Sequence, residues 1–270
     1  MSPRANPTRM PAYYVPHGGG PCFFMEWPGD PHAWDTLAGF LRAIPGELQA
    51  KPRAIVVVSA HWEAGVPTVT AAPEPALIYD YSGFPPSTYA LKYPAPGEPV
   101  LAARIQTLLE GAGIAARADA GRGFDHGVFV PLLLVAPDAD IPIVQLSLVR
   151  GLDPAAHFAI GQALAPLRDE GILIVGSGMS FHNMSAFLGP EKAHGDAFDA
   201  WLGESIAADP SSRRDRLAQW QNAPQARLAH PREEHLLPLM VVAGAAESDS
   251  GRTVFHDRIL GTPISAYRFG

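Results

Sequence analysis

The sequence has 270 residues, of which 47% are hydrophobic and 17% charged, and a formal net charge of -7 at pH 7. This composition excludes a disordered chain and indicates a globular protein with a sizeable core. Lys and Arg form no basic stripe, no apolar run approaches the roughly 18 residues that span a bilayer, and the N-terminal stretch lacks the apolar core of a signal peptide. We therefore expect a cytoplasmic protein that binds neither nucleic acid nor membrane. Homo-oligomer formation stays open.

Short continuous apolar runs predict buried strands, and apolar residues at helical spacing predict helices between them. The predicted strands are Ala12–Val15, Ala54–Ser59, Thr68–Ala71, Ile143–Leu148, Ile172–Gly176 and Ile264–Phe269. The predicted helices are Pro31–Ile44, Pro99–Gly111, Phe129–Val135, Pro154–Arg168, Asp196–Ala207, Ser211–Gln221 and His235–Ala246. Because strands alternate with helices and no linker divides the chain, we expect one α/β domain over residues 1–270. Its central sheet should be mostly parallel or mixed and flanked by helices.

Two helix starts are predicted from proline positions. Asp30 is a good N-cap before Pro31, since proline suits the first helical position. Pro238 has no N–H to donate, which a helix tolerates only near its start. The last helix should therefore begin near Glu234, with His235 in its first turn. Before the second predicted helix, the stretch Ile78 to Pro99 is rich in Pro, Gly and Tyr and predicts a long ordered loop of functional interest.

Three of the ten histidines follow predicted strands. One residue separates His17 from the first predicted strand. His61 comes directly after "AIVVVSA", and His182 comes a few residues after "ILIVGSG". Ligands of open α/β sheets bind beyond the carboxyl ends of the strands, so we expect these rings to meet at one edge. His126, in "GFDHG", and His235, at a helix start, are placed to join them.

Several imidazoles at one sheet edge indicate a catalytic metal site. Neutral imidazole suits Fe, Zn, Cu and Ni, and histidines beyond three ligands can act as acids or bases. The remaining histidines are interpreted as surface or core residues: His32, His157, His194, His230 and His256. His194 and Asp196, in "AHGDAF", either line a site entrance or belong to a solvated helix cap.

The glycines Gly18, Gly19 and Gly20 admit three interpretations: a phosphate cradle, a turn, or space beside His17. The spacing matches neither GxGxxG nor GxxxxGK, and Pro21 interrupts any helix start that would bind phosphate. The pattern therefore favours a turn that leaves room for a flat ligand. Cys22, the sole cysteine, is interpreted as a small buried hydrophobic residue, with a place near the metal as the alternative.

The chain resembles the class III extradiol ring-cleavage dioxygenases, the superfamily of protocatechuate 4,5-dioxygenase, and within it the DOPA 4,5-dioxygenase-like branch. The matching pieces occur in the family's order and span nearly the whole chain. They are "HGGGP", "AIVVVSAHW", "GFPPSTYALKYPAPG", "GFDHG", "DADIPIVQLSL", "GSGMSFHN" and "EEHLLPL". One departure is that the family often has HGSP where this chain has HGGGP.

The resemblance implies that His17, His61 and His235 bind the metal at the carboxyl ends of the strands. Glu234 is a rival third ligand, because the wider superfamily uses a glutamate there. His182 is similar to the family's acid/base histidine, which the branch can also use as a fourth ligand. His126 is similar to the residue that contacts substrate or dioxygen.

The resemblance further implies an oxidoreductase that uses Fe(II) and O2 to open the ring of a catechol-type aromatic diol, in aromatic compound catabolism. Zn(II) can replace iron in purified protein. The loop is expected to shape the ring pocket through Phe84 and Tyr93, while Tyr81, Tyr89 and Tyr93 can equally be packing residues. Two alternatives are a metal-binding relative that signals or binds without catalysis, and a zinc-dependent hydrolase. The catechol and the regiochemistry of cleavage stay open.

Overall fold

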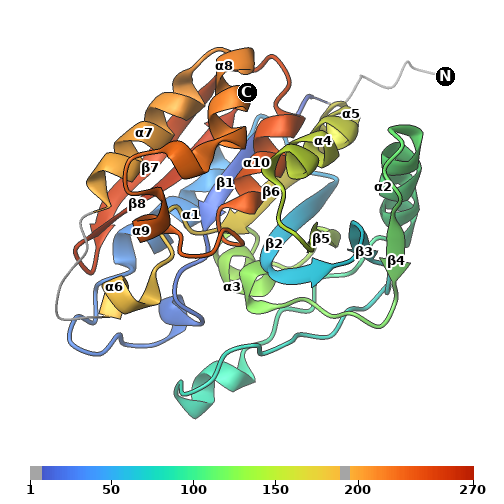
Figure 1. Ribbon diagram of the computed structural model, residues 1–270. Helices are drawn as coiled ribbons and strands as arrows, with labels where there is room; N and C mark the ends of the chain where they lie inside the picture. The colour runs from blue at the N-terminus through green and yellow to red at the C-terminus, as the bar shows by residue number, and fades with distance from the viewer. Residues whose placement is uncertain (1–7, 189–194) are drawn as a thin grey trace.

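A computed structural model of the protein describes residues 8–188 and 195–270 (Figure 1). Its centre is an eight-stranded sheet with strand order β4-β3-β5-β2-β6-β1-β8-β7. The strands are β1 (Ala12–Pro16), β2 (Ala54–Ala64), β3 (Thr68–Thr70), β4 (Arg117–Asp119), β5 (Ile143–Val149), β6 (Ile172–Gly178), β7 (Gly251–Ile259) and β8 (Thr262–Phe269).

The four central strands β5, β2, β6 and β1 are parallel, so their carboxyl ends meet at one edge. Strand β8 pairs antiparallel with β1 and with β7, and β3 pairs antiparallel with β5. The predicted mixed α/β sheet is therefore confirmed. The central strands are continuous apolar runs because helices cover both of their faces.

Helices pack on both sides of the sheet (Figure 1). They are α1 (Asp35–Glu47), α2 (Pro99–Gly111), α3 (His126–Val135), α4 (Pro154–Leu164), α5 (Pro166–Asp169), α6 (Met184–Leu188), α7 (Asp196–Ala207), α8 (Pro210–Ala218), α9 (Ala226–Ala229) and α10 (Leu237–Ala245). Helices α1 and α3 contact each other on one face, whereas α10 contacts β6 and β1 and packs against α4 on the other. None of the helices described is long and apolar enough to cross a membrane.

The structure corrects the first predicted helix. Helix α1 begins at Asp35 and not at Pro31, and it continues to Glu47 through Pro45. The Asp30 carboxylate accepts a hydrogen bond from the His32 N–H at 3.1 Å, which closes a turn instead of capping a helix. The helix start is therefore displaced by one turn.

Proline also shifts the other helix boundaries. Helix α3 starts at His126, three residues earlier than predicted, because its Pro131 is tolerated inside the helix. Pro131 cannot donate to the Gly127 carbonyl, and the Ser177 hydroxyl supplies that hydrogen bond instead. Pro166 divides the predicted helix Pro154–Arg168 into α4 and α5.

The ends of two more predicted elements differ from the structure. The predicted helix Ser211–Gln221 is α8 followed by a separate 3-10 turn at Trp220–Asn222. Helix α10 begins at Leu237, so His235 lies in the turn before the helix and not in its first turn.

Three strand features escaped prediction. Strand β2 does not end before His61 but continues to Ala64, with a register shift against β5 between Val58 and Glu63. Strands β4 and β7 were not predicted, because β4 has only three residues and β7 alternates exposed charged residues with half-buried ones.

Candidate active site

The carboxyl edge of the central strands brings the predicted histidines together. His17 follows β1 directly, and its N–H donates to the Gly178 carbonyl at the end of β6, at 3.0 Å. His61 lies in the irregular part of β2, beside the strand ends of β1 and β6. The irregularity matters because it turns this stretch out of regular pairing with β5.

The turn before α10 is fixed to the same strand ends. The His235 carbonyl accepts hydrogen bonds from the Met179 N–H at 3.1 Å and from the Tyr14 hydroxyl at 2.7 Å. A Cβ at Gly178 would collide with this carbonyl, so glycine is needed for the close approach. The strand end thereby determines where the His235 ring lies.

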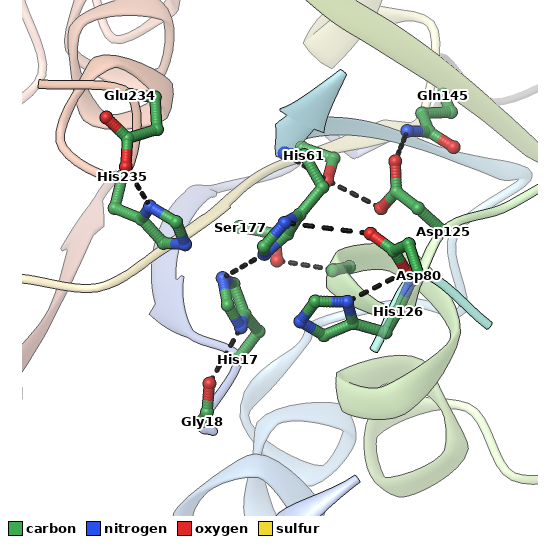
Figure 2. Close-up of polar contacts among 12 residues, drawn as sticks. His17, Gly18, His61, Asp80, Asp125, His126, Gln145, Ser177, Glu234 and His235 are labelled. Carbon is green, nitrogen blue, oxygen red and sulfur yellow. Dashed lines mark hydrogen bonds and ion pairs between the residues drawn. The ribbon is translucent and has the colours of Figure 1, made fainter. Parts of the chain in front are cut away.

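Five histidines line one cavity of about 420 Å³: His17, His61, His126, His182 and His235. The His17 and His61 Nε2 atoms are 3.2 Å apart, as Figure 2 shows. The donor atoms of His17, His61 and His126 all lie within 4.8 Å of one another, as do those of His182, Glu234 and His235. The His235 ring centroid is 5.2 Å from that of His17 and 4.9 Å from that of His61.

In each ring of the predicted ligand set, the other nitrogen, Nδ1, faces an oxygen atom. The His17 Nδ1–H donates to the Gly18 carbonyl at 3.0 Å, and the His235 Nδ1–H donates to Glu234 Oε1 at 2.9 Å. His61 Nδ1 lies 3.6 Å from Asp80 Oδ2. The hydrogen bonds of His17 and His235 place the proton on Nδ1 and leave the Nε2 lone pair for a metal.

Burial keeps these imidazoles neutral. It lowers the pKa of His17 and of His61 well below the usual value, and the neighbouring histidines lower it further. Burial likewise lowers the pKa of His235 to about 4, although Glu234 opposes the shift. Neutral imidazole is the form that binds metal, so the three rings are ready to act as ligands near pH 7.

A metal ion fits between His17 and His61. The predicted third ligand, His235, is not in their group of donor atoms within 4.8 Å, whereas His126 is. Two imidazole nitrogens at about 2.1 Å from one metal, on neighbouring positions, lie about 3.0–3.4 Å apart. The 3.2 Å between the His17 and His61 Nε2 atoms agrees with that spacing. Two facing lone pairs repel each other, and a cation between them removes the repulsion.

Two carboxylates, which the sequence analysis did not assign to these roles, face the Nδ1 side of the histidines. Asp80 contacts His126 and His61, and Glu234 contacts His235 and His182. Asp80 went unnoticed because it lies in the long loop, 46 residues before His126. Its only sequence signal is an acidic residue between two tyrosines in a loop already considered functional.

A buried network behind the histidines centres on Asp125, whose side chain is fully buried. Its carboxylate accepts hydrogen bonds from the Ser59 hydroxyl at 2.7 Å, from Arg122 at 3.0 Å and from the Gln145 amide. Ser59 in turn accepts from the His61 N–H at 3.2 Å. The network therefore fixes the backbone that carries His61 and the start of α3.

The walls of the cavity are largely apolar. Trp27, Trp34, Phe84 and Phe181 line it, together with the three consecutive glycines. Gly18 and Gly20 have positive φ angles of 84° and 56°, which favour glycine. A Cβ at Gly20 would lie 2.9 Å from Phe84, and one at Gly18 would overlap the Cys22 sulfur. The glycines thus form a turn and let Phe84 and Cys22 pack closely against its backbone.

The two predicted substrate-binding residues are placed differently. Phe84 lines the cavity, whereas Tyr93 is absent from the cavity lining. Tyr93 is buried, and its hydroxyl donates to the Ala136 carbonyl at 3.0 Å, which is a packing role. Tyr81 lines the cavity in its place. Buried Cys22 packs beneath the glycines, as expected for a small hydrophobic residue.

The remaining histidines among the described residues lie apart from the cavity lining. His157 and His230 are buried and bonded to backbone groups, and His32 and His256 are largely exposed. His194 lies outside the described residues. Asp196 begins α7 and pairs with Arg258, away from the cavity lining.

Comparisons with known proteins agree with this geometry. Residues 11–270 match the family model of the catalytic LigB subunit of aromatic ring-opening dioxygenase. The chain is 40% identical to "Dioxygenase tasH" of Hapsidospora irregularis, over 97% of this chain and 87% of that protein. It is 43% identical to "4,5-DOPA dioxygenase extradiol" of Beta vulgaris, over 81% of this chain and 83% of the relative.

Among solved structures, an uncharacterized protein from Escherichia coli K12 superposes with a TM-score of 0.75 at 32% sequence identity. The match covers 97% of this chain and 100% of that one. The family model and the relatives therefore cover the strand ends, the long loop and the turn before α10. The chain belongs to the class III extradiol dioxygenase family, in its DOPA-dioxygenase-like branch.

Proposed function

We propose that this protein is an extradiol dioxygenase that inserts O2 into the ring of a catechol-type substrate next to the diol. The proposal assigns Fe(II) to His17, His61 and His235. One observation carries it: five imidazoles line one apolar cavity in a chain of the ring-opening dioxygenase family. The family's pattern supports His235 over His126 as the third ligand, and the contacts of Glu234 to two Nδ1 atoms favour a supporting place for that carboxylate.

Three neutral nitrogen ligands suit a non-haem Fe(II) site with open positions. Bound Fe(II) would supply a positive charge that lowers the pKa of the ring hydroxyls and a place where O2 and the diol come together. Zn(II) suits the same imidazole set, so purified protein can carry it without catalysing an oxidation.

His182 is proposed as the acid/base. Its Nδ1 lies 3.3 Å from Glu234 Oε1, which leaves Nε2 for a substrate proton. A neutral imidazole can accept a proton from the diol at Nε2 and return it later in the reaction. His126, held through its Nδ1 by Asp80, is proposed to hydrogen-bond a substrate oxygen as negative charge develops there.

The apolar wall orients the ring. Phe84 packs on Gly20, and Trp27 and Trp34 pack on Gly19, so these aromatic side chains border the open space of the cavity. A flat ring in that space loses contact with water and is held with its diol toward the histidines. In the net reaction one ring C–C bond next to the diol breaks, and both atoms of O2 enter the product. The product is a muconic semialdehyde.

The test is anaerobic reconstitution with Fe(II), followed by a panel of catechols and a pulse of air. We expect oxygen uptake in equal amount to the catechol consumed, with a yellow ring-fission product. A His61→Ala protein treated identically should consume no oxygen. If wild-type protein with bound Fe(II) consumes no oxygen with any catechol, the dioxygenase assignment fails. Ester or peptide hydrolysis by zinc-loaded protein that persists without oxygen would instead favour a hydrolase.

A further inference from the structure

We propose that Asp80 and Glu234 are positioning residues, each of which holds one metal-ligand histidine together with one histidine of the catalytic pair. Asp80 serves His61 and His126, and Glu234 serves His235 and His182. The assignment of these roles rests on the proposed function, because it concerns how the same site is held in shape.

Asp80 contacts two rings and a backbone group. Its Oδ1 accepts hydrogen bonds from His126 Nδ1 at 2.8 Å and from the His126 N–H at 2.9 Å. Its Oδ2 lies 3.6 Å from His61 Nδ1 (Figure 2). One oxygen of this carboxylate therefore faces each ring.

The backbone holds Asp80 in place. The Ile78 N–H donates to the Phe124 carbonyl, and the Phe124 N–H donates to the Ala76 carbonyl, both at 2.8 Å. These bonds join the loop to the segment that enters α3 beside His126. The next residue, Tyr81, lines the cavity. The same loop therefore shapes the cavity wall and supplies the carboxylate that orients two histidines.

Glu234 repeats the arrangement on the other side of the cavity. Its Oε1 accepts from His235 Nδ1 at 2.9 Å and lies 3.3 Å from His182 Nδ1. The rings of these two histidines are stacked, with an angle of 18° between their planes. Arg232 lies 3.3 Å from Oε2 and supports the negative charge.

A carboxylate at Nδ1 stabilises the tautomer that carries its proton on Nδ1 and its lone pair on Nε2. A carboxylate has two acceptor oxygens, whereas a carboxamide has one acceptor and one donor group. Asn at position 80 therefore keeps the shape but cannot accept from both rings, because Oδ1 faces His126 and Oδ2 faces His61. At position 234 the one oxygen Oε1 faces both rings, so Gln keeps that acceptor but loses the negative charge that strengthens both hydrogen bonds. Each substitution should disturb its own pair of histidines and leave the other pair unchanged.

The first experiment needs neither metal nor turnover. Long-range ¹H–¹⁵N spectra of ¹⁵N-histidine-labelled apoprotein report the tautomer of each ring, with assignments from single histidine variants. We expect Nδ1–H tautomers at all four rings in wild-type protein. Asp80→Asn should alter only His61 and His126, and Glu234→Gln only His235 and His182. Unchanged spectra in both variants, or equal changes at all four rings in each, would overturn the proposal.

The matched control is Glu63→Gln, which removes the same charge from a side chain of similar exposure, 25% against 24% for Asp80. Glu63 pairs with Arg232 at 2.6 Å and has no contact with a histidine ring among the interactions described. A second control, Tyr79→Phe, removes the 2.6 Å hydrogen bond to the Leu91 carbonyl within the same loop. Neither control should change a histidine tautomer.

The second experiment measures Zn²⁺ affinity by competition with a chromophoric chelator. Loss of an outer partner of a metal ligand weakens metal binding about 10- to 100-fold, so we expect this loss in Asp80→Asn and Glu234→Gln. Affinities within about twofold of wild type in both variants would overturn the proposal. If wild-type protein consumes no oxygen with any catechol, the dioxygenase assignment is refuted. The tautomer pattern and the Zn²⁺ affinities still test the positioning roles of Asp80 and Glu234.

Discussion

Two regions place histidines beside oxygen-bearing side chains: the carboxyl edge of the central strands, which carries the candidate site, and the β7–β8 hairpin. Only the first region buries its histidines. On the hairpin, His256 Nδ1 lies 3.2 Å from Asp199 and 3.1 Å from the Ser265 hydroxyl. The His256 side chain is 56% exposed, whereas that of His235 is 5% exposed. Residue types alone therefore do not distinguish the two regions.

The two regions differ in burial, and burial decides how strongly a histidine interacts with its partner. An exposed ion pair contributes little free energy, because water and salt screen it. At the buried edge, burial lowers the pKa of His17 and His235, and their oxygen partners at Nδ1 direct the Nε2 lone pairs into an apolar cavity. In addition, the Ser265 hydroxyl donates to Asp199 and not to His256, so the hairpin lacks the hydrogen-bond order of a hydrolase triad.

The largest expected effect is the loss of bound metal, which distinguishes the metal-ligand histidines from the other histidines of the cavity. His61→Ala and His235→Ala should each lose bound metal and all oxygen uptake, because each removes a nitrogen ligand. His126→Ala should retain metal while activity falls. Metal content after Fe(II) or Zn(II) loading and dialysis measures this. If His126→Ala loses metal as His61→Ala does and His235→Ala retains it, the third ligand is His126.

The second largest effect is expected for His182→Ala. Loss of an acid/base group lowers kcat by about 10²- to 10⁴-fold, and most metal should remain. Steady-state oxygen uptake with measured metal content checks both parts. His182→Gln, which keeps a polar side chain of similar reach but cannot carry the proton, should be equally slow. Metal content as low as that of His61→Ala would show instead that His182 is a ligand.

A pH effect on stability of the apoprotein follows from His230, which is fully buried against the Ser180 carbonyl. Burial lowers its pKa to about 3. The unfolded chain takes up the proton near pH 6.5, so folding loses stability as pH falls from there toward 3, by about 2 kcal/mol at pH 5. Urea denaturation of wild type and His230→Asn at pH 7 and 5 measures it. An unchanged pH difference in the variant would contradict the assignment.

Gly20→Ala should have a smaller effect, on both stability and substrate binding. Its positive φ costs an alanine about 1–2 kcal/mol, and the new Cβ would press on Phe84. We expect a lower free energy of unfolding and a raised KM with bound metal unchanged. Gly29→Ala, also at positive φ but with nothing within 4 Å of its Cβ, is the matched control and should leave KM unaltered. A KM change equal in both would mean that the cavity wall is not involved.

His256→Ala should have the smallest effect. Its side chain is largely exposed, so we expect a change in unfolding free energy within about 0.5 kcal/mol and unchanged oxygen uptake. Thermal denaturation and activity assays check this. A loss of activity comparable with that of the cavity histidines would break the distinction between the two regions.

Much of the fold was predictable because buried parallel strands are continuous apolar runs. The four central strands follow directly from that pattern, and three histidines at their ends indicate the site. Helix boundaries were less predictable, because they depend on partners far along the chain. Pro131 lies within α3 only because Ser177 satisfies the freed Gly127 carbonyl, 50 residues away.

The sequence by itself determined the four central strands, the family pattern and the set of five histidines, since local hydrophobic runs and short motifs encode them. Only the tertiary structure decided which carboxylates serve which rings, because Asp80 and His126 are 46 residues apart and meet through loop packing. It also decided that Tyr93 packs against Ala136 while Tyr81 borders the cavity. Neighbouring tyrosines in one loop are alike in sequence, and only the path of the backbone gives them different surroundings.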